Sequence, residues 1–189
     1  MADPIVRIFC ADPGLTNFGW SLLEHNRATG HTTVVRCGTI TGKSLVKQQK
    51  DMHPRFEKRY IILWELERVL QEMFSEMVPT HVVSESAFSH SFIQAYAALI
   101  LVIQSIRTAS MRALGRDIYL IAPCESKKAV SSYGNANKES VQDAIFKNPQ
   151  ITILKSTKTT ADPITEHAYD SIAAGIAFIQ GHLPSIPTV

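Results

Sequence analysis

Hydrophobic and polar positions along the chain predict strands first and helices later. Three short runs of β-branched and aromatic residues, at 5–11, 18–24 and 32–40, are separated by turn residues. Such runs are typical of strands that pair with their neighbours. We therefore expect the chain to begin with an antiparallel meander of three strands, followed by a polar, lysine-rich mobile loop over 41–53.

The remainder of the chain alternates between helices and short strands. Its apolar residues recur at helical spacing over long stretches, with short apolar runs between them. The last helix is expected to start with Asp162 as N-cap and Pro163 in its first turn. This order of elements indicates an α/β fold with a mixed five-stranded sheet flanked by helices, in a single domain over 1–189. We expect helices at about 54–78, 92–114, 127–132, 138–146 and 162–180, and strands at 81–85 and 117–122.

Composition narrows the class of protein. The 189 residues are 45% hydrophobic and 19% charged, as in an ordinary globular domain. The net charge of +2 permits a nucleic-acid partner without requiring one. The three cysteines stand at unrelated spacings, which predicts reduced thiols. We expect neither a signal peptide nor a membrane span, and hence a cytoplasmic protein of bacterial, phage or viral origin.

Two acidic residues end predicted strands. Asp12 ends the first strand at a turn that Pro13 and Gly14 make tight and stiff, and Glu85 ends the strand over 81–85. In sheets flanked by helices, ligands gather at strand ends. A carboxylate on so rigid a turn is suited to bind a metal ion, although an aspartate that only starts a turn is an equally good interpretation of Asp12 taken alone.

A third acidic position lies in the last predicted helix. Asp170 falls in its second turn and shares one face with His167 and Glu166, three and four residues before it. Small residues surround them and allow the helix to approach the sheet closely, which brings Asp170 towards Asp12 and Glu85. The alternative is that these acids only complement the helix dipole, which explains Glu166 better than Asp170.

Three carboxylates from distant segments repel one another unless a cation joins them. Oxygen ligands of this kind select Mg²⁺ or Mn²⁺. Two such ions about 4 Å apart stabilise the attacking water and the leaving oxygen of a phosphodiester. The residues therefore predict metal-assisted phosphodiester hydrolysis.

Four motifs follow one another along the chain. They are Asp12-Pro-Gly-Leu-Thr-x-x-Gly-Trp20, Glu85-Ser-Ala-Phe88, Lys127-Lys-Ala-Val-x-x-x-Gly-x-Ala-Asn-Lys138 and His167-Ala-Tyr-Asp170-x-x-Ala. In this order they resemble the motifs of the RuvC family of Holliday-junction resolvases, in the RNase H-like superfamily, and the resemblance covers most of the chain. It implies an endodeoxyribonuclease that resolves four-way DNA junctions by paired symmetric nicks, using two Mg²⁺ or Mn²⁺ ions per site.

The resemblance also implies roles for individual residues. The implied metal ligands and catalytic residues are Asp12, Glu85, His167 and Asp170, with Lys127 as a further catalytic residue. The implied DNA contacts are Phe88, Lys128 and Lys138. A hydrophobic staple for the next helix explains Phe88 as well as stacking on an unpaired base does.

The chain departs from the family pattern in two places. His167 replaces the acid that is commoner at its position, so it is expected to act as a neutral ligand or to carry protons, and Glu166 competes with it for the ligand place. An imidazole ligand favours Mn²⁺ over Mg²⁺. The segment 42–53 is longer and more basic than the family leads us to expect, and the sequence assigns it no role.

Other classes of function fit parts of the pattern. A broader branched-DNA nuclease, or a non-catalytic DNA-junction binder of the same fold, would carry the same motifs. An actin-like ATPase fits less well because the chain has no second Asp-x-Gly strand turn. We therefore expect branched DNA as the partner, without a nucleotide cofactor or a membrane.

Two symmetric cuts require two active sites, and one chain carries one set of acids, so we expect a homodimer. The predicted helix over 92–114 is apolar on two sides, which gives it more hydrophobic surface than one sheet can bury and indicates the interface. A fully internal helix is the alternative. The two sides are Ile93, Ala97, Ile100 and Ile103, and Tyr96, Leu99, Val102 and Ile106.

Overall fold

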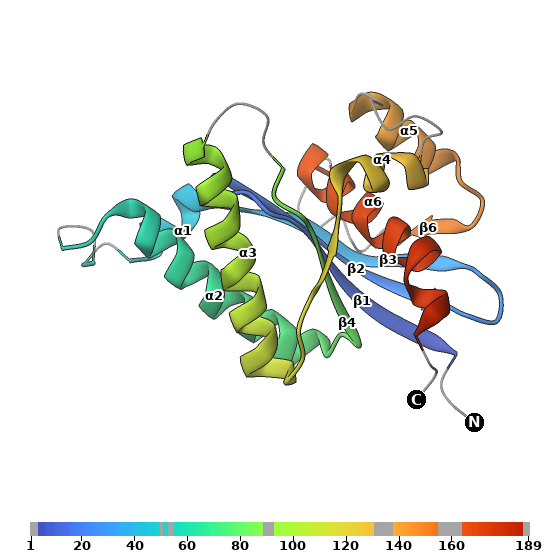
Figure 1. The fold of residues 1–189 in the computed structure, drawn as a ribbon, viewed down its shortest axis with the longest axis horizontal. Coiled ribbons are helices and arrows are strands. Elements are labelled where there is room, and N and C mark those ends of the chain that lie inside the picture. The colour runs from blue at the N-terminus through green and yellow to red at the C-terminus, as the bar shows by residue number, and fades with distance from the viewer. Residues whose placement is uncertain are drawn as a thin grey trace.

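The computed structural model describes residues 4–49, 51–52, 55–88, 93–130, 138–154 and 164–186. In these residues a six-stranded sheet lies between two layers of helices, with α1–α3 on one face and α4–α6 on the other (Figure 1). The strands are β1 (Ile5–Asp12), β2 (Asn17–Asn26), β3 (Thr32–Thr41), β4 (His81–Glu85), β5 (Tyr119–Ile121) and β6 (Ile151–Ile153). The helices are α1 (Gly42–Gln48), α2 (Lys58–Met77), α3 (Ile93–Leu114), α4 (Pro123–Val130), α5 (Lys138–Lys147) and α6 (Glu166–Gly181).

The strands follow the order β5-β4-β1-β2-β3-β6. The first three form an antiparallel meander, and β4 and β5 add to it in parallel with β1. This arrangement confirms the predicted mixed sheet. The sequence did not predict β6, which pairs in parallel with the start of β3. Three residues are too few for a period of two to stand out in the sequence.

The apolar core occupies both faces of the sheet. In β1, Ile8 and Cys10 pack into a cluster with α6, whereas Phe9 and Ala11 pack into a second cluster with α2 and α3. All four side chains are fully buried. A strand covered on both faces reads as a continuous apolar run, which explains why this stretch lacks hydrophobic-polar alternation.

Two element starts differ from the sequence prediction. The segment after β3 was expected to be a loop, but 42–48 is helical, with Thr41 as N-cap and Leu45 buried. The last helix begins at Glu166 and is capped by the Thr165 side chain, so the prediction that Asp162 caps it is wrong. Residues 162 and 163 themselves lie outside the described residues.

Length and composition make α3, alone among the helices of the described ranges, apolar enough to cross a membrane. The core helix of a soluble protein passes the same test, so this finding is weak evidence. From Val102 onwards α3 belongs to the core, because Val102, Ile106 and Ala109 are fully buried. The residues before Val102 are exposed or partly exposed, and Ile93 at the first position is 87% exposed.

The last helix packs directly on the central strands. A Cβ atom added at Gly175 would lie 2.4 Å from Leu23 Cδ1 and 2.5 Å from Cys10 Sγ, closer than non-bonded atoms approach. The hydroxyl groups of Ser171 and Ser21 form a buried hydrogen bond of 3.0 Å across the same contact. The small residues of α6 therefore do allow the close approach that the sequence predicted.

Gly175→Ala is expected to destabilise the protein by about 1–3 kcal/mol, because the added methyl group overpacks buried side chains. Gly181→Ala at the end of the same helix is the matched control, since nothing lies within 4 Å of its added Cβ. The control should change the free energy of unfolding by less than about 0.5 kcal/mol. Urea unfolding followed by circular dichroism measures both variants, and equal effects would contradict the tight packing of α6.

Candidate metal centre

Asp12 and Glu85 end two neighbouring strands. The parallel register pairs Ala11 of β1 with Ser84 of β4, so the next residue of each strand is one of these acids. Their carboxylates therefore leave the sheet at the same edge. This is the edge at which the sequence predicted a ligand site.

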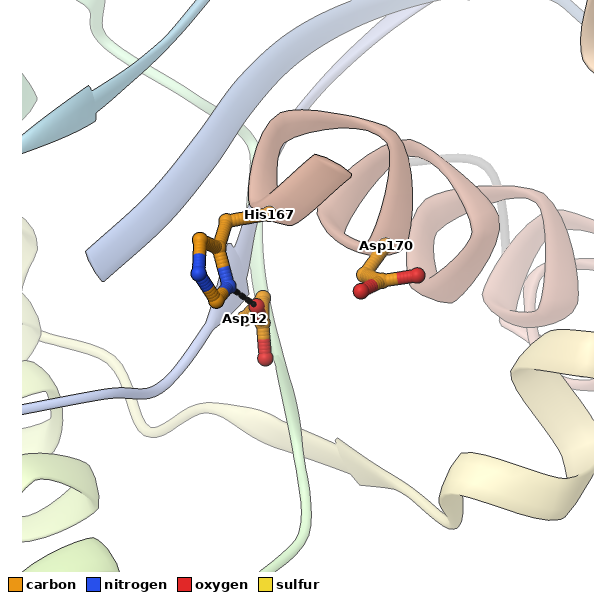
Figure 2. A group of neighbouring side chains, drawn as sticks. All are labelled: Asp12, His167 and Asp170. Carbon is orange, nitrogen blue, oxygen red and sulfur yellow. Dashed lines mark hydrogen bonds and ion pairs between the residues drawn. The ribbon is translucent and has the colours of Figure 1, made fainter. Parts of the chain in front are cut away.

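Asp12, His167 and Asp170 come together from β1 and α6, as Figure 2 shows. One ligand atom from each of the three lies within 4.8 Å of the other two. The His167 Nδ1 atom is 2.8 Å from Asp12 Oδ2, a hydrogen bond in which the imidazole donates and the carboxylate accepts. The predicted meeting of the first strand with the last helix is thus present, although 155 positions of sequence separate Asp12 from His167.

The first turn of α6 reaches Asp12 because β2 has no side chain in the way. Gly19 pairs with Asp12 across the β1–β2 ladder, and a Cβ atom added to it would lie 2.1 Å from the backbone oxygen of His167. Thr165 fixes the start of the helix: its side chain accepts a bond from the Ala168 amide. Its hydroxyl also makes a short hydrogen bond to that of Thr39 on β3.

Glu166 does not join this group. Its Oε1 atom lies 3.7 Å from His167 Nε2, on the far side of the imidazole from the Asp12 bond, and its side chain is 45% exposed. Glu166 and His167 were the alternative ligands on the predicted helix, and the structure brings His167, not Glu166, to Asp12.

Glu85 lies beside the group and is coupled to it through its charge. Burial, and then the negative charges of Asp12 and Asp170, raise the pKa of Glu85 from 4.5 to about 8. The Ser126 hydroxyl and the Lys127 ammonium act in the opposite direction and lower it. Without a cation the centre therefore holds more negative charge than its surroundings can stabilise.

Ser126 is a site residue that sequence reasoning missed. It is fully buried on α4, where its hydroxyl approaches the Glu85 carboxylate. Among the described residues it meets no partner at full hydrogen-bond geometry. The only signal in the sequence was its position next to Lys127, because the burial of a serine cannot be read from one sequence.

The residues expected to contact DNA are not members of the group formed by Asp12, His167 and Asp170. Phe88 follows β4 and is 59% exposed, which weakens its alternative interpretation as a buried hydrophobic staple. Lys128 is exposed on α4. Lys138 is the first residue of α5, and its side chain lies outside the described residues.

The donor set suits a divalent cation. Two carboxylates and an imidazole converge, with a third carboxylate beside them, and carboxylate oxygens are preferred ligands of Mg²⁺ and Mn²⁺. A cation would also offset the repulsion that raises the pKa of Glu85. The residues present therefore fit a metal centre.

A mixed sheet between helices, with acids at the ends of β1 and β4 and on the last helix, defines an RNase H-like fold with a candidate metal centre. The family described as crossover junction endodeoxyribonuclease RuvC matches residues 8–178. The chain belongs to this family.

Curated relatives agree with this assignment, and several solved structures share the fold. A crossover junction endodeoxyribonuclease RuvC of Azorhizobium caulinodans is 28% identical over 179 residues, covering 93% of this chain and 90% of the relative. The RuvC structure of Thermus thermophilus has a TM-score of 0.67 at 15% identity and covers 92% of this chain and 93% of its own. A second structure of that protein, in complex with Holliday junction substrate, has the same TM-score. The yeast mitochondrial Holliday junction resolvase has a TM-score of 0.64 at 8% identity, and the match covers 95% of this chain and 80% of the resolvase.

The raised pKa of Glu85 predicts how stability depends on pH. Since its pKa is about 8 in the folded protein and 4.5 in the reference state, the folded protein binds more protons between these pH values. The stability of the metal-free protein should therefore fall as the pH rises from 5 to 8. Glu85→Gln removes the ionisable group and with it this loss of stability. The free energy of unfolding of the variant, relative to wild type, should therefore be higher at pH 8.5 than at pH 5 by on the order of 3 kcal/mol.

Urea unfolding in the presence of a chelator measures this difference at both pH values. Glu139→Gln, at an exposed position of α5, controls for the loss of a carboxylate elsewhere. If the advantage of Glu85→Gln is the same at pH 5 and pH 8.5, Glu85 is ionised throughout and the coupling to Asp12 and Asp170 is wrong.

Proposed function

We propose that this chain is a structure-specific endodeoxyribonuclease that resolves four-way DNA junctions by paired symmetric nicks. The observation that carries the proposal is the convergence of Asp12, His167 and Asp170, with Glu85 beside them, in a chain of the RuvC family. The Thermus thermophilus relative that shares the fold is known in complex with Holliday junction substrate, which supports the same class of substrate here.

The proposed cofactor is Mg²⁺ or Mn²⁺, with two ions per site. Asp12 lies between Glu85 on the neighbouring strand and the pair on α6, so it can share its two oxygens between both sides. Asp12 and Glu85 would hold one ion, and Asp12, His167 and Asp170 the other. Such ions, when bound, stabilise the attacking water and the leaving oxygen of a phosphodiester.

The surrounding residues support the same chemistry. The hydrogen bond to Asp12 fixes the orientation of the His167 ring before any ligand arrives. Lys127 brings a positive charge close to Glu85, where it can contact the cut phosphate and stabilise the charge that develops on it. Phe88, Lys128 and Lys138 are proposed to contact the DNA outside the scissile phosphate, Phe88 by stacking on an unpaired base.

Asp12→Asn, Glu85→Gln and Asp170→Asn should each lower junction cleavage by at least about 100-fold, because each removes an anionic ligand. Junction affinity measured in Ca²⁺ should stay within about threefold of wild type, since the ligands contribute little phosphate contact. Glu166→Gln on the same helix is the matched control and should retain most of the activity. Gel shifts and cleavage of a labelled four-way junction measure both properties.

The same assay decides between the candidate functions. Substantial cutting by one of the three variants would remove that residue from the centre, and no cutting by wild type in Mg²⁺ or Mn²⁺ would leave a non-catalytic junction binder. Four-way, three-way, flap and linear duplex substrates compared side by side separate a junction resolvase from a broader branched-DNA nuclease. We expect paired nicks in the four-way junction and weaker cutting of the others.

A homodimer is proposed to supply the second active site. The surface that supports it is the N-terminal half of α3, where Ile93, Tyr96, Ile100 and Leu101 are between 39% and 87% exposed. This face differs from the one read from the sequence, because Ile103 is only 5% exposed and belongs to the core. A two-fold axis through such a patch would pair it with itself and remove it from water.

Ile100→Asp together with Leu101→Asp should convert the dimer to monomers that nick weakly or not at all. Both side chains are exposed in the single chain, so the fold should survive the change. Met111→Asp on the same helix, at a position 51% exposed outside the patch, is the control and should remain dimeric. Sedimentation equilibrium at micromolar concentration without DNA measures the mass, and a monomeric wild type would rule out a preformed dimer.

A further inference from the structure

The positive charge of this chain is concentrated in one segment. Residues 42–64 hold six of the 19 lysines and arginines but only two of the 17 acids. The chain as a whole has a net charge of +2, so the rest of the sequence is slightly acidic. A concentration of this kind is a local electrostatic feature that the net charge conceals.

Several arginines outside this segment have acidic partners. Arg36 is paired with Glu76, and Arg107 with Asp117. Five exposed cations of the segment, by contrast, take part in no ion pair within the described part of the chain. They are Lys43, Lys47, Arg55, Lys58 and Arg59.

The acids of α2 nearest these cations are already neutralised. Glu65 is fully buried and accepts bonds from Arg68 and Gln49, and Glu67 is paired with Arg112 of α3. Neither is available to balance the five exposed cations. The exposed acids of the segment itself, Asp51 and Glu57, offset at most two of the five charges, so the surface stays cationic and attracts a polyanion.

This cationic surface is anchored to the turn that carries Asp12. The Gly42 amide at the start of α1 donates a 2.8 Å hydrogen bond to the Thr16 carbonyl. The second turn of α2 packs on the same place, because a Cβ atom added at Gly42 would lie 3.0 Å from Ile62 Cδ1 and 2.5 Å from the Leu15 carbonyl oxygen. In Figure 1, α1 and the start of α2 extend together from one end of the sheet. The surface is thus attached to the same end of the sheet as the turn that follows Asp12.

Aromatic side chains are interleaved with the cations. Phe56, Tyr60 and Trp64 recur every four residues and are 53%, 60% and 52% exposed. They line a mostly apolar groove of about 550 Å³ that extends to Ser105 of α3. Its charged lining residue is Glu67, which is paired with Arg112, and the cations lie outside the lining. Exposed aromatic rings among lysines and arginines are the combination that binds DNA with unpaired bases, because the cations contact phosphates while the rings stack on bases.

We propose that α1 and the N-terminal end of α2 form a second DNA-contact surface, which holds a junction arm beyond the cut phosphate and stacks unpaired bases at the branch on Phe56 and Tyr60. This inference rests on the proposed function and adds a part of the substrate to it. A second copy of the chain fits this surface less well than DNA does, since a two-fold contact would bring the five cations against their own copies.

Removing two cations tests the phosphate contacts. Lys58→Gln together with Arg59→Gln should lower the slope of log Kd against log salt by about 1–2, because each lost phosphate contact removes about 0.9 from that slope. Arg36→Gln with Lys147→Gln is the matched control: it removes the same charge from two residues that already have acidic partners. Affinity for a four-way junction is measured in Ca²⁺ between 50 and 300 mM salt.

Removing the rings tests the stacking. Phe56→Ala with Tyr60→Ala should weaken junction binding at least about fivefold at every salt concentration without changing the slope, and should affect linear duplex less. A junction affinity and slope equal to wild type for both double variants would overturn this inference while leaving the proposed function intact. A wild type that neither binds nor cuts the junction would overturn both. Loss of the dimer in either variant by sedimentation would assign the groove to a second copy and overturn the inference.

Discussion

The direct packing of α6 on β1 and β2 is the contact on which the candidate centre depends. His167 and Asp170 come from a helix far from Asp12 in sequence, and they reach it because Gly19 and Gly175 present no side chains at the contact. Hydrogen bonds of Ser171 with Ser21 and of His167 with Asp12 cross this contact. They can form because the small size of the glycines lets the backbones approach so closely, and an added methyl group would overpack the interface.

The close packing of α6 on the sheet also has an electrostatic cost. It brings the charge of Asp170 close enough to Glu85 to add to the effects of burial and of Asp12, and together they raise the pKa of Glu85 to about 8. Apolar clusters on both faces of the sheet hold the acids in place despite this repulsion. The metal-free fold is therefore less stable than its core alone would make it, and a bound cation would offset part of that cost.

Elements near the centre could be predicted because their signals are local. The turn after Asp12 can be predicted from the adjacent Pro13 and Gly14, and the long helices show a helical period of apolar residues over several turns. The elements that the sequence did not predict have a common cause. Helix α1 depends on the burial of Leu45, and strand β6 depends on pairing with β3, and a single sequence shows neither. Ser126 was missed for the same reason, since only the packing of α4 on the strand ends reveals that its hydroxyl faces Glu85.

Two surfaces outside the centre are subject to opposite physical constraints. The apolar patch on α3 gains free energy by contact with an identical surface, because burying it requires no complementary charge. The cationic surface on α1 and α2 cannot pair with itself in this way, since like charges would face each other across the axis. In the proposed dimer, the apolar patch would therefore form the contact between chains, and the like charges would keep the two cationic surfaces out of it.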